Sequence, residues 1–277
     1  MAVVRIVTDS TAFLPREKME AYNIKVVPLY VHFPDEIILD GSIDNKVFFE
    51  KMKKTSKLPF TSQPSPGDFL KVYEPIINNG DEIVSIHISS GISGTVESAA
   101  TAARMLQTDR ISIVDSTVTS GGLALLTIAA AEAAEEGKAR DEIVDLLEQL
   151  KKKMKVLFVP ATLEYLKKGG RIGGAQALLG TILQIKPVLM FKDGKIEVFD
   201  KIRTMKKAMR RMVDELPEKG QNLRITILQA EAVETAGILK ELIEERLPGT
   251  AVEIMGISPV IGTHVGPGVI GLAFLQK

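Results

Sequence analysis

The chain has 277 residues, of which 45% are hydrophobic and 25% charged, as is ordinary for a globular protein long enough to form two domains. Its 35 lysines and arginines balance 35 aspartates and glutamates, so it lacks the basic excess expected of a protein that binds nucleic acid along its surface. Because cysteine is absent, disulfides, thiol nucleophiles and cysteine-ligated zinc or iron–sulfur centres are excluded.

The apolar segments do not predict a membrane helix or a leader. The opening residues, MAVVRIVTDS, are typical of a strand rather than of a secretory signal. The longest apolar stretches, at 123–134 and 178–191, meet charged or amide residues well before the roughly 20 apolar residues that a membrane span needs. Together with the lack of cysteine, this pattern favours a cytoplasmic protein.

The first half of the chain predicts strands that alternate with helices. Strands at 3–8, 83–88 and 111–114 are each followed by a helix, at 15–22, 95–105 and 121–136. Between them we expect strands at 26–33 and 37–39, helices at 44–57 and 67–78, and an ordered loop or linker at 59–66. This alternation is typical of an α/β fold with a parallel sheet. The segments IVTDSTA and IVDSTVT should place acidic and hydroxyl side chains on one edge of that sheet.

The second half has a different pattern. A helix from Asp141 ends in three lysines at 151–153, and new strand material begins at 156. We therefore expect an N-terminal α/β domain at 1–153 and a C-terminal α+β domain with a mixed sheet at 154–277. The Asp193-Gly194 pair predicts a hairpin, followed by helices at 205–216 and 234–247 and strands at 224–228, 251–257 and 269–275.

One stretch, IVSIHISSGISGTVESAA at 83–100, places a Ser/Gly-rich turn between a strand and a helix. The start of a helix offers backbone N–H groups and the positive end of the helix dipole. We interpret Ser93 as the N-cap and expect it, with Gly94, to hold a carboxylate or phosphate. A plain N-cap explains the same residues. The segment GISGT at 91–95 also nearly matches the G-x-S-x-G turn of a hydrolase, so acyl transfer at Ser93 is a rival hypothesis.

Three further segments are candidates for binding. The loop PFTSQPSP at 59–66 offers Thr61, Ser62 and Gln63 either as a ligand clamp or simply as a proline-stiffened turn. The segment KKGGRIGG at 167–174 surrounds Arg171 with four glycines, which suggests close approach of the backbone to an anion. The segment GTHVGPG at 262–268 holds His264 in what we expect to be a glycine loop leading into the last strand.

Several common sites are not predicted. The other two histidines, His32 and His87, are interpreted as structural. Because no two of the three histidines have metal-ligand spacing, we expect no metal site. The phosphate-binding pattern G-x-x-x-x-G-K-[ST] and the dinucleotide pattern G-x-G-x-x-G are also missing.

Taken in order along the chain, the motifs resemble those of the DegV family. They are IVTDSTA, TSQPSPGDF, ISSGISGT, VDS, LKKGGRI, IKPVL and THVGPG. The resemblance implies two α/β domains with a long-chain fatty acid in a tunnel between them. It further implies a non-catalytic carrier protein that presents the carboxyl group of its lipid to a separate fatty acid kinase, which makes an acyl phosphate. The fatty acid would be its ligand, and no cofactor is expected.

The resemblance also assigns residues. Thr61 and Ser93, with the backbone of Gly94, would bind the carboxylate. The kinase or the acyl phosphate would be faced by Ser62, Gln63, Arg171, Arg203 and His264. Arg203, in KIRTMKKA, is equally explained as the solvated start of a basic helix. Lipid delivery would involve transient membrane contact, whereas nucleic acid is not an expected partner.

Two other functions remain open at this point. A serine hydrolase or acyltransferase would use Ser93 with His264. A site for a phosphosugar or nucleotide would lie between the glycine-rich loops.

Overall fold

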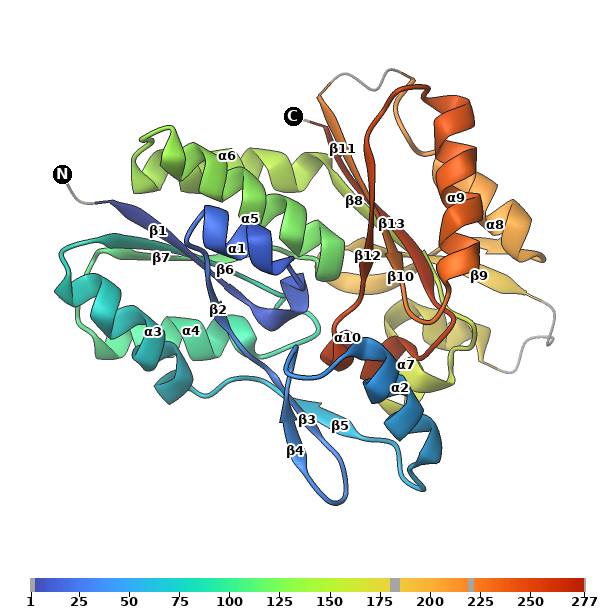
Figure 1. Cartoon of the computed structure of the whole chain (residues 1–277), viewed down its shortest axis with the longest axis horizontal. Helices are drawn as coiled ribbons and strands as arrows, with labels where there is room; N and C mark the ends of the chain where they lie inside the picture. Colours follow the sequence, from blue (N-terminus) through green and yellow to red (C-terminus); the bar gives the residue numbers. More distant parts are fainter. Residues whose placement is uncertain (1–2, 180–184, 219–221, 277) are drawn as a thin grey trace.

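The computed structural model describes residues 3–179, 185–218 and 222–276, and its first sheet is parallel. The strand order is β2-β1-β6-β7. Helices α5 and α6 contact one face of this sheet, and α3 and α4 contact the other (Figure 1). The bounds are β1 Val4–Asp9, β2 Lys25–Val27, β6 Glu82–His87, β7 Ile111–Asp115, α3 Pro66–Asn78, α4 Thr95–Met105, α5 Ser120–Glu135 and α6 Arg140–Lys153.

The second sheet is mixed and has the order β10-β9-β8-β13-β11-β12, in which only β11 and β12 are parallel. Helices α8 and α9 cover one of its faces, and α5 and α6 meet the other (Figure 1). The bounds are β8 Met154–Val159, β9 Lys186–Lys192, β10 Lys195–Ile202, β11 Leu223–Gln229, β12 Val252–Gly256, β13 Ile270–Gln276, α8 Met205–Val213 and α9 Val233–Arg246. The predicted fold class, a parallel α/β sheet followed by a mixed sheet, is confirmed.

A third, three-stranded sheet lies beside the first two, with the antiparallel order β4-β3-β5. It packs against α10, which also contacts α2 and α7. The remaining elements are short. Their bounds are β3 Tyr30–His32, β4 Ile37–Leu39, β5 Phe60–Ser62, α1 Arg16–Ala21, α2 Asn45–Lys54, α7 Glu164–Lys168, α10 Pro259–Val265, and the 3-10 turns η1 Ser10–Ala12 and η2 Gly173–Leu178.

Four local predictions were wrong. The strand expected at 26–33 is two strands in different sheets, separated at Pro28, which cannot donate a ladder hydrogen bond. The loop expected at 59–66 contains the edge strand β5, and an edge strand tolerates flanking prolines. The glycine loop expected around His264 is helix α10, with Pro259 in its first turn. The N-cap of α4 is Gly94 rather than Ser93.

Buried polar side chains tie the first sheet together where β1 and β6 end. Asp9 accepts a hydrogen bond from the Ile88 backbone N–H at 2.8 Å, and its second oxygen accepts from the Thr11 backbone N–H at 3.0 Å. The His87 ring lies 3.2 Å from Asp9 and 2.7 Å from the Ser85 hydroxyl. All of these side chains are buried, so the Ser–His–Asp set has no access to substrate and holds the strand ends in register.

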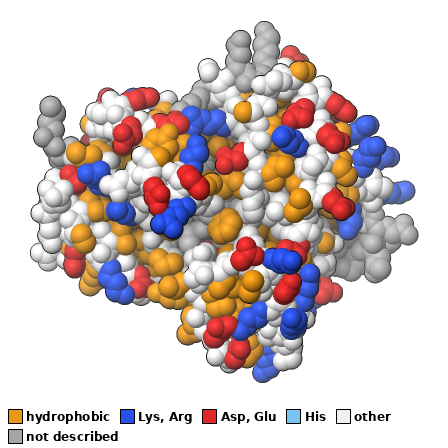
Figure 2. Space-filling model, viewed as in Figure 1, with side chains coloured by type: hydrophobic (Ala, Val, Ile, Leu, Met, Phe, Trp, Pro, Cys, Tyr) orange, Lys and Arg blue, Asp and Glu red, His pale blue; other side chains and the backbone are white. Residues whose placement is uncertain are grey.

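The surface carries charges of both signs, as expected for a chain whose formal net charge is zero. Acidic and basic side chains are interspersed on the face in Figure 2. Across the three described ranges, every helix is too short or too polar to cross a membrane.

Helix α5 is the element shared by the two large sheets. It contacts β1 and β6 of the first sheet and β8, β11 and β13 of the second. Twelve of its 16 residues are buried, and most of these are Ala, Gly or Leu. A Cβ built on Gly122 would lie 2.5 Å from Cγ2 of Val156, a closer approach than real atoms allow. The missing side chain therefore lets the helix reach β8.

Replacing Gly122 by alanine should destabilise the protein by about 1–3 kcal/mol, because the new methyl group meets a stiff valine in a packed interior. Helix propensity alone would give the opposite sign, about 1 kcal/mol in favour of alanine. Gly237 in α9 is the matched control, since a Cβ there meets nothing within 4 Å. Urea unfolding should show Gly122→Ala destabilised and Gly237→Ala stabilised. A stabilised Gly122→Ala would contradict the tight packing of α5.

Candidate functional site

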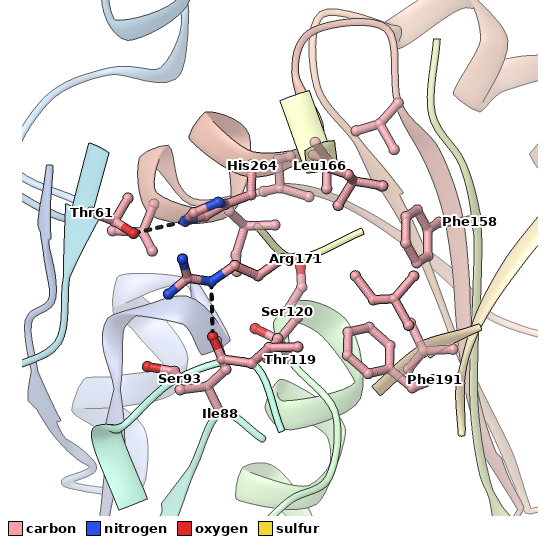
Figure 3. Close-up of a pocket in the computed structure, with 18 of the residues that line it drawn as sticks. Thr61, Ile88, Ser93, Thr119, Ser120, Phe158, Leu166, Arg171, Phe191 and His264 are labelled. Atoms are coloured by element: carbon pink, nitrogen blue, oxygen red, sulfur yellow. Dashed lines mark hydrogen bonds between the residues drawn. The ribbon is translucent and has the colours of Figure 1, made fainter. Parts of the chain in front are cut away.

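A cavity of about 290 Å³ lies where the three sheets meet. This volume is close to the lower end of the roughly 300–1,000 Å³ typical of ligand sites. Polar side chains gather at one end, where Figure 3 shows Thr61, Ser93, Arg171 and His264, and the rings of Phe158 and Phe191 lie at the other end. The other apolar residues that line it include Leu29, Ile88, Ile92, Val156, Leu166, Ile196, Leu228, Ile257, Val260, Ile261, Val265 and Val269.

Thr61 and His264 meet at the polar end. Thr61 lies in β5, opposite buried Val31 of β3, and its side chain faces inward, whereas that of Phe60 is exposed. His264 lies in α10, which is capped by the Ser258 hydroxyl. The Thr61 hydroxyl and His264 Nε2 are 2.7 Å apart. The other ring nitrogen, Nδ1, is buried and has no partner among the described residues.

The surroundings of His264 keep it uncharged. Burial, and secondarily the charge of Arg171, lower the pKa of His264 to about 4. The imidazole is therefore neutral at pH 7, with one ring nitrogen able to donate a hydrogen bond and the other able to accept one. Gly169 makes room for the ring, because a Cβ there would lie 2.2 Å from Nδ1.

Arg171 joins two of the predicted glycine-rich segments. Its Nε donates to the carbonyl of Ile92 at 3.1 Å, and its Nη1 donates to the carbonyl of Gly169 at 2.7 Å. The guanidinium is thus held at the polar end of the cavity by backbone acceptors, and no carboxylate pairs with it among the described residues. A fixed positive charge beside a neutral imidazole favours an anionic ligand.

The turn at 89–94 forms the wall opposite His264. The Ser93 hydroxyl is 2.8 Å from that of Thr95 and accepts a weak hydrogen bond from the Thr95 backbone N–H at 3.4 Å. Gln63 clamps this turn, because its Nε2 donates to the carbonyl of Gly94 at 3.1 Å and to the Ser98 hydroxyl at 2.9 Å. A Cβ on Gly94 would collide with the Gln63 side chain. Gln63 therefore fixes the distance between β5 and the turn.

Most of the predicted site residues come together. The cavity is lined by Thr61, Ser62, Gln63, Ser93, Arg171 and His264. The hydroxyl of Ser62 is engaged elsewhere, 2.8 Å from His32 Nε2. Gly94 borders an adjoining recess that it shares with Ser93 and Arg171. Arg203 is exposed between β10 and α8 and does not line the cavity.

Sequence reasoning missed two groups of lining residues. The aromatic end, Phe158 and Phe191, comes from β8 and β9 and carried no signal beyond apolar strand patterning. Thr119 and Ser120 begin α5 and also line the cavity. Their signal was visible, because IVDSTVTSGG continues a run of hydroxyl residues past the end of a strand that already resembled the first strand.

The contacts do not assemble a serine nucleophile with a base. His264 is paired with Thr61, and Ser93 with Thr95. No carboxylate orients the Nδ1 atom of His264, since that atom has no partner within the described ranges. Among all the residues that the structure describes, no cluster of three or more His, Asp or Glu side chains could hold a metal ion.

A known family matches residues 3–277, and its description reads "Uncharacterised protein, DegV family". The chain belongs to the DegV family. A DegV domain-containing protein from Clostridium acetobutylicum is 40% identical over 281 residues, which cover 99% of this chain and 98% of that protein.

Two solved DegV structures are also similar over the whole length. A DegV family protein from Thermus thermophilus, described as binding fatty acid, has a TM-score of 0.92 and 36% identity, covering 99% of this chain and all of that one. DegV from Bacillus subtilis, described as a fatty acid binding protein, has a TM-score of 0.87 and 36% identity, covering both chains completely.

The low pKa of His264 predicts an acid-dependent loss of stability. Between pH 6.5 and about 4 the unfolded chain binds a proton that the folded chain does not, so the free energy of unfolding falls as the pH falls. The loss by pH 4 should be on the order of 3 kcal/mol. Asp40 has the opposite effect on the free energy of unfolding over the same pH range. Burial raises its pKa to about 6, so the folded chain takes up this proton before the unfolded chain does as the pH falls.

Comparison with His264→Gln separates the two effects, because Asp40 is present in both proteins. The stability of the wild type relative to the variant should decline from pH 7 to pH 4 in chemical denaturation. A difference that is constant across this range would show that His264 titrates normally.

Proposed function

We propose that this chain binds a long-chain fatty acid in the cavity and presents its carboxyl group to a partner fatty acid kinase, which forms the acyl phosphate. The observation that carries the proposal is the division of the cavity into a polar end, with Thr61, His264 and Arg171, and an apolar end lined by two aromatic rings. Fatty acid binding by similar DegV structures supports the same assignment.

The carboxylate is assigned to Thr61 and Ser93, which line the polar end, and to the backbone of Gly94, which borders the adjoining recess. Hydrogen bonds to a charged group each contribute about 1.5–3 kcal/mol. Each buried CH₂ group contributes roughly 0.8 kcal/mol, so a chain of more than a dozen provides on the order of 10 kcal/mol before ordering costs. The tail thus supplies affinity, and the head group sets orientation.

The remaining polar residues are assigned to the kinase encounter and the acyl phosphate. Ser62, Gln63, Arg171 and His264 lie at the polar end, and Arg203 is exposed on the second half of the chain. In this scheme the chain is a carrier rather than an enzyme, its two domains are 1–153 and 154–277, and the fatty acid is its ligand, with no cofactor. It works in the cytoplasm with transient membrane contact during lipid exchange.

Mass spectrometry of an organic extract of the denatured protein tests the binding directly. The expected result is a stoichiometric long-chain fatty acid, and delipidated protein should take up added acid. Ser93→Ala should raise the Kd for the acid about tenfold or more, because it removes a hydrogen bond to a charged group. It should leave the fold intact, with a cooperative thermal melt, because the residue lies in the turn at 89–94 and outside the helices and strands.

Ser90→Ala is the matched control for that variant. Ser90 lies in the same turn, but its hydroxyl donates to Asp115 and it does not line the cavity. Its Kd should equal that of the wild type. An extract without fatty acid, combined with no uptake of added acid, would refute the binding proposal.

Arg203→Ala should leave the Kd for fatty acid unchanged and slow acyl phosphate formation by the fatty acid kinase of the same organism, because Arg203 is exposed and outside the cavity. Lys206→Ala is the control, since Lys206 is an exposed cation one turn along the same basic segment. Equal rates of acyl phosphate formation for both variants and the wild type would show that Arg203 does not contribute to the encounter with the kinase.

A further inference from the structure

The start of α5 carries two buried hydroxyls whose hydrogen bonds are not accounted for. Thr119 is 6% exposed and Ser120 is 4% exposed. Neither hydroxyl oxygen has a hydrogen-bond partner among the described residues. An unpaired buried polar group costs about 1–3 kcal/mol, so such groups call for a specific explanation.

Other hydroxyls at comparable positions in this chain are paired. At the starts of α3 and α10, Ser65 and Ser258 accept from backbone N–H groups three residues ahead. Within α5 itself, Thr127 donates to the carbonyl of Leu123 at 2.8 Å. Thr119 occupies the N-cap position of α5 and makes no capping bond. A threonine hydroxyl at an N-cap usually accepts a hydrogen bond from the helix backbone, whereas the Thr119 hydroxyl remains free to bond another group.

The loop before α5 is held by other groups. Ser120 has a φ of 52° and Thr117 a φ of 59°, which is uncommon for residues other than glycine. The Asp115 carboxylate accepts from the Thr117 backbone N–H at 2.8 Å, and the Val118 carbonyl accepts from the Ser89 backbone N–H at 2.8 Å. The two hydroxyls are thus fixed by a strained loop, and this strain is of the kind found at ligand sites.

Both residues line the middle of the cavity. In the view of Figure 3, Thr119 and Ser120 lie between Arg171 and His264 on one side and the rings of Phe158 and Phe191 on the other. Apolar residues that line the same cavity include Ile88, Val156 and Leu228. In this view the two residues lie on the side of the polar end that faces the rings, so an acyl chain that runs from the polar end to the rings would pass them.

We propose that Thr119 and Ser120 form a second polar subsite, and that it recognises a fatty acid carrying an oxygen substituent, a hydroxyl or keto group, part-way along its chain. This rests on the proposed function, because the chain must lie in the cavity. Both hydroxyls can donate to the substituent oxygen, and the positive end of the α5 dipole favours an acceptor there. An unsubstituted chain leaves both hydroxyls buried and unpaired.

A matched ligand series tests the subsite. The Kd values of delipidated wild-type protein for stearate, for hydroxystearates with the hydroxyl at successive chain positions, and for the corresponding keto acids are measured by calorimetry. At least one acid oxygenated in the middle of its chain should bind roughly tenfold more tightly than stearate. The preference should peak at one position, because the hydroxyls are fixed relative to the carboxylate end.

Variants identify the residues responsible. Thr119→Val and Ser120→Ala should each reduce the ratio between the Kd for stearate and the Kd for the preferred oxygenated acid. Thr119→Ser should retain the preference, because it keeps the hydroxyl. Thr127→Val in the same helix is the control, since its hydroxyl is satisfied within α5 and it does not line the cavity. Thermal melts establish that each variant folds.

The outcomes separate the subsite from the proposed function. Tight binding of stearate with no preference at any chain position overturns the subsite and leaves fatty acid binding intact. A Thr119→Val variant that loses affinity for stearate and oxygenated acids equally would assign the hydroxyl to the carboxylate or to a bound water, and also overturns the subsite. Failure to bind any of these acids would refute the proposed function and the subsite with it.

Discussion

The position of α5 between two sheets is the constraint on which the rest of the molecule depends. A helix covered on both sides needs small residues where the sheets come closest, and the glycines and alanines of α5 meet that need. Larger side chains in its first turn would hold β8 and β11 away from the first sheet. The cavity lies at the N-terminal end of this helix, where residues that follow β2 and β6 and side chains of the second sheet line a shared space.

The polar end of the cavity is built by elements that fix one another rather than by a single motif. Gln63 clamps the turn at 89–94, Arg171 ties that turn to the segment after α7, and α10 brings His264 onto β5. Each of these hydrogen bonds joins segments that are distant in sequence. The site is therefore preorganised by neighbouring backbone groups, so less ordering is left for the ligand to impose on binding.

Patterning predicted most of the fold, because long strands and helices repeat their apolar residues with a clear period. It failed at β5 and α10, which are short and rich in proline or glycine, so tertiary contacts decide their conformation. The candidate residues at the polar end were found from loop composition and family resemblance. The pairing of Thr61 with His264 could not be found, because no local pattern links them, and α5 was predicted without the role of the hydroxyls at its start.

The contact between Thr61 and His264 joins residues 203 positions apart. The polar end therefore does not exist in either half of the chain alone and forms only when β5 and α10 have both folded and docked. Contacts of such separation form against a large loss of chain entropy and favour slow folding. A ligand held there binds only the fully assembled chain, so its presence would lower the population of partly folded chains by mass action. A chain with a ligand bound there would accordingly be more resistant to proteolysis than an empty one.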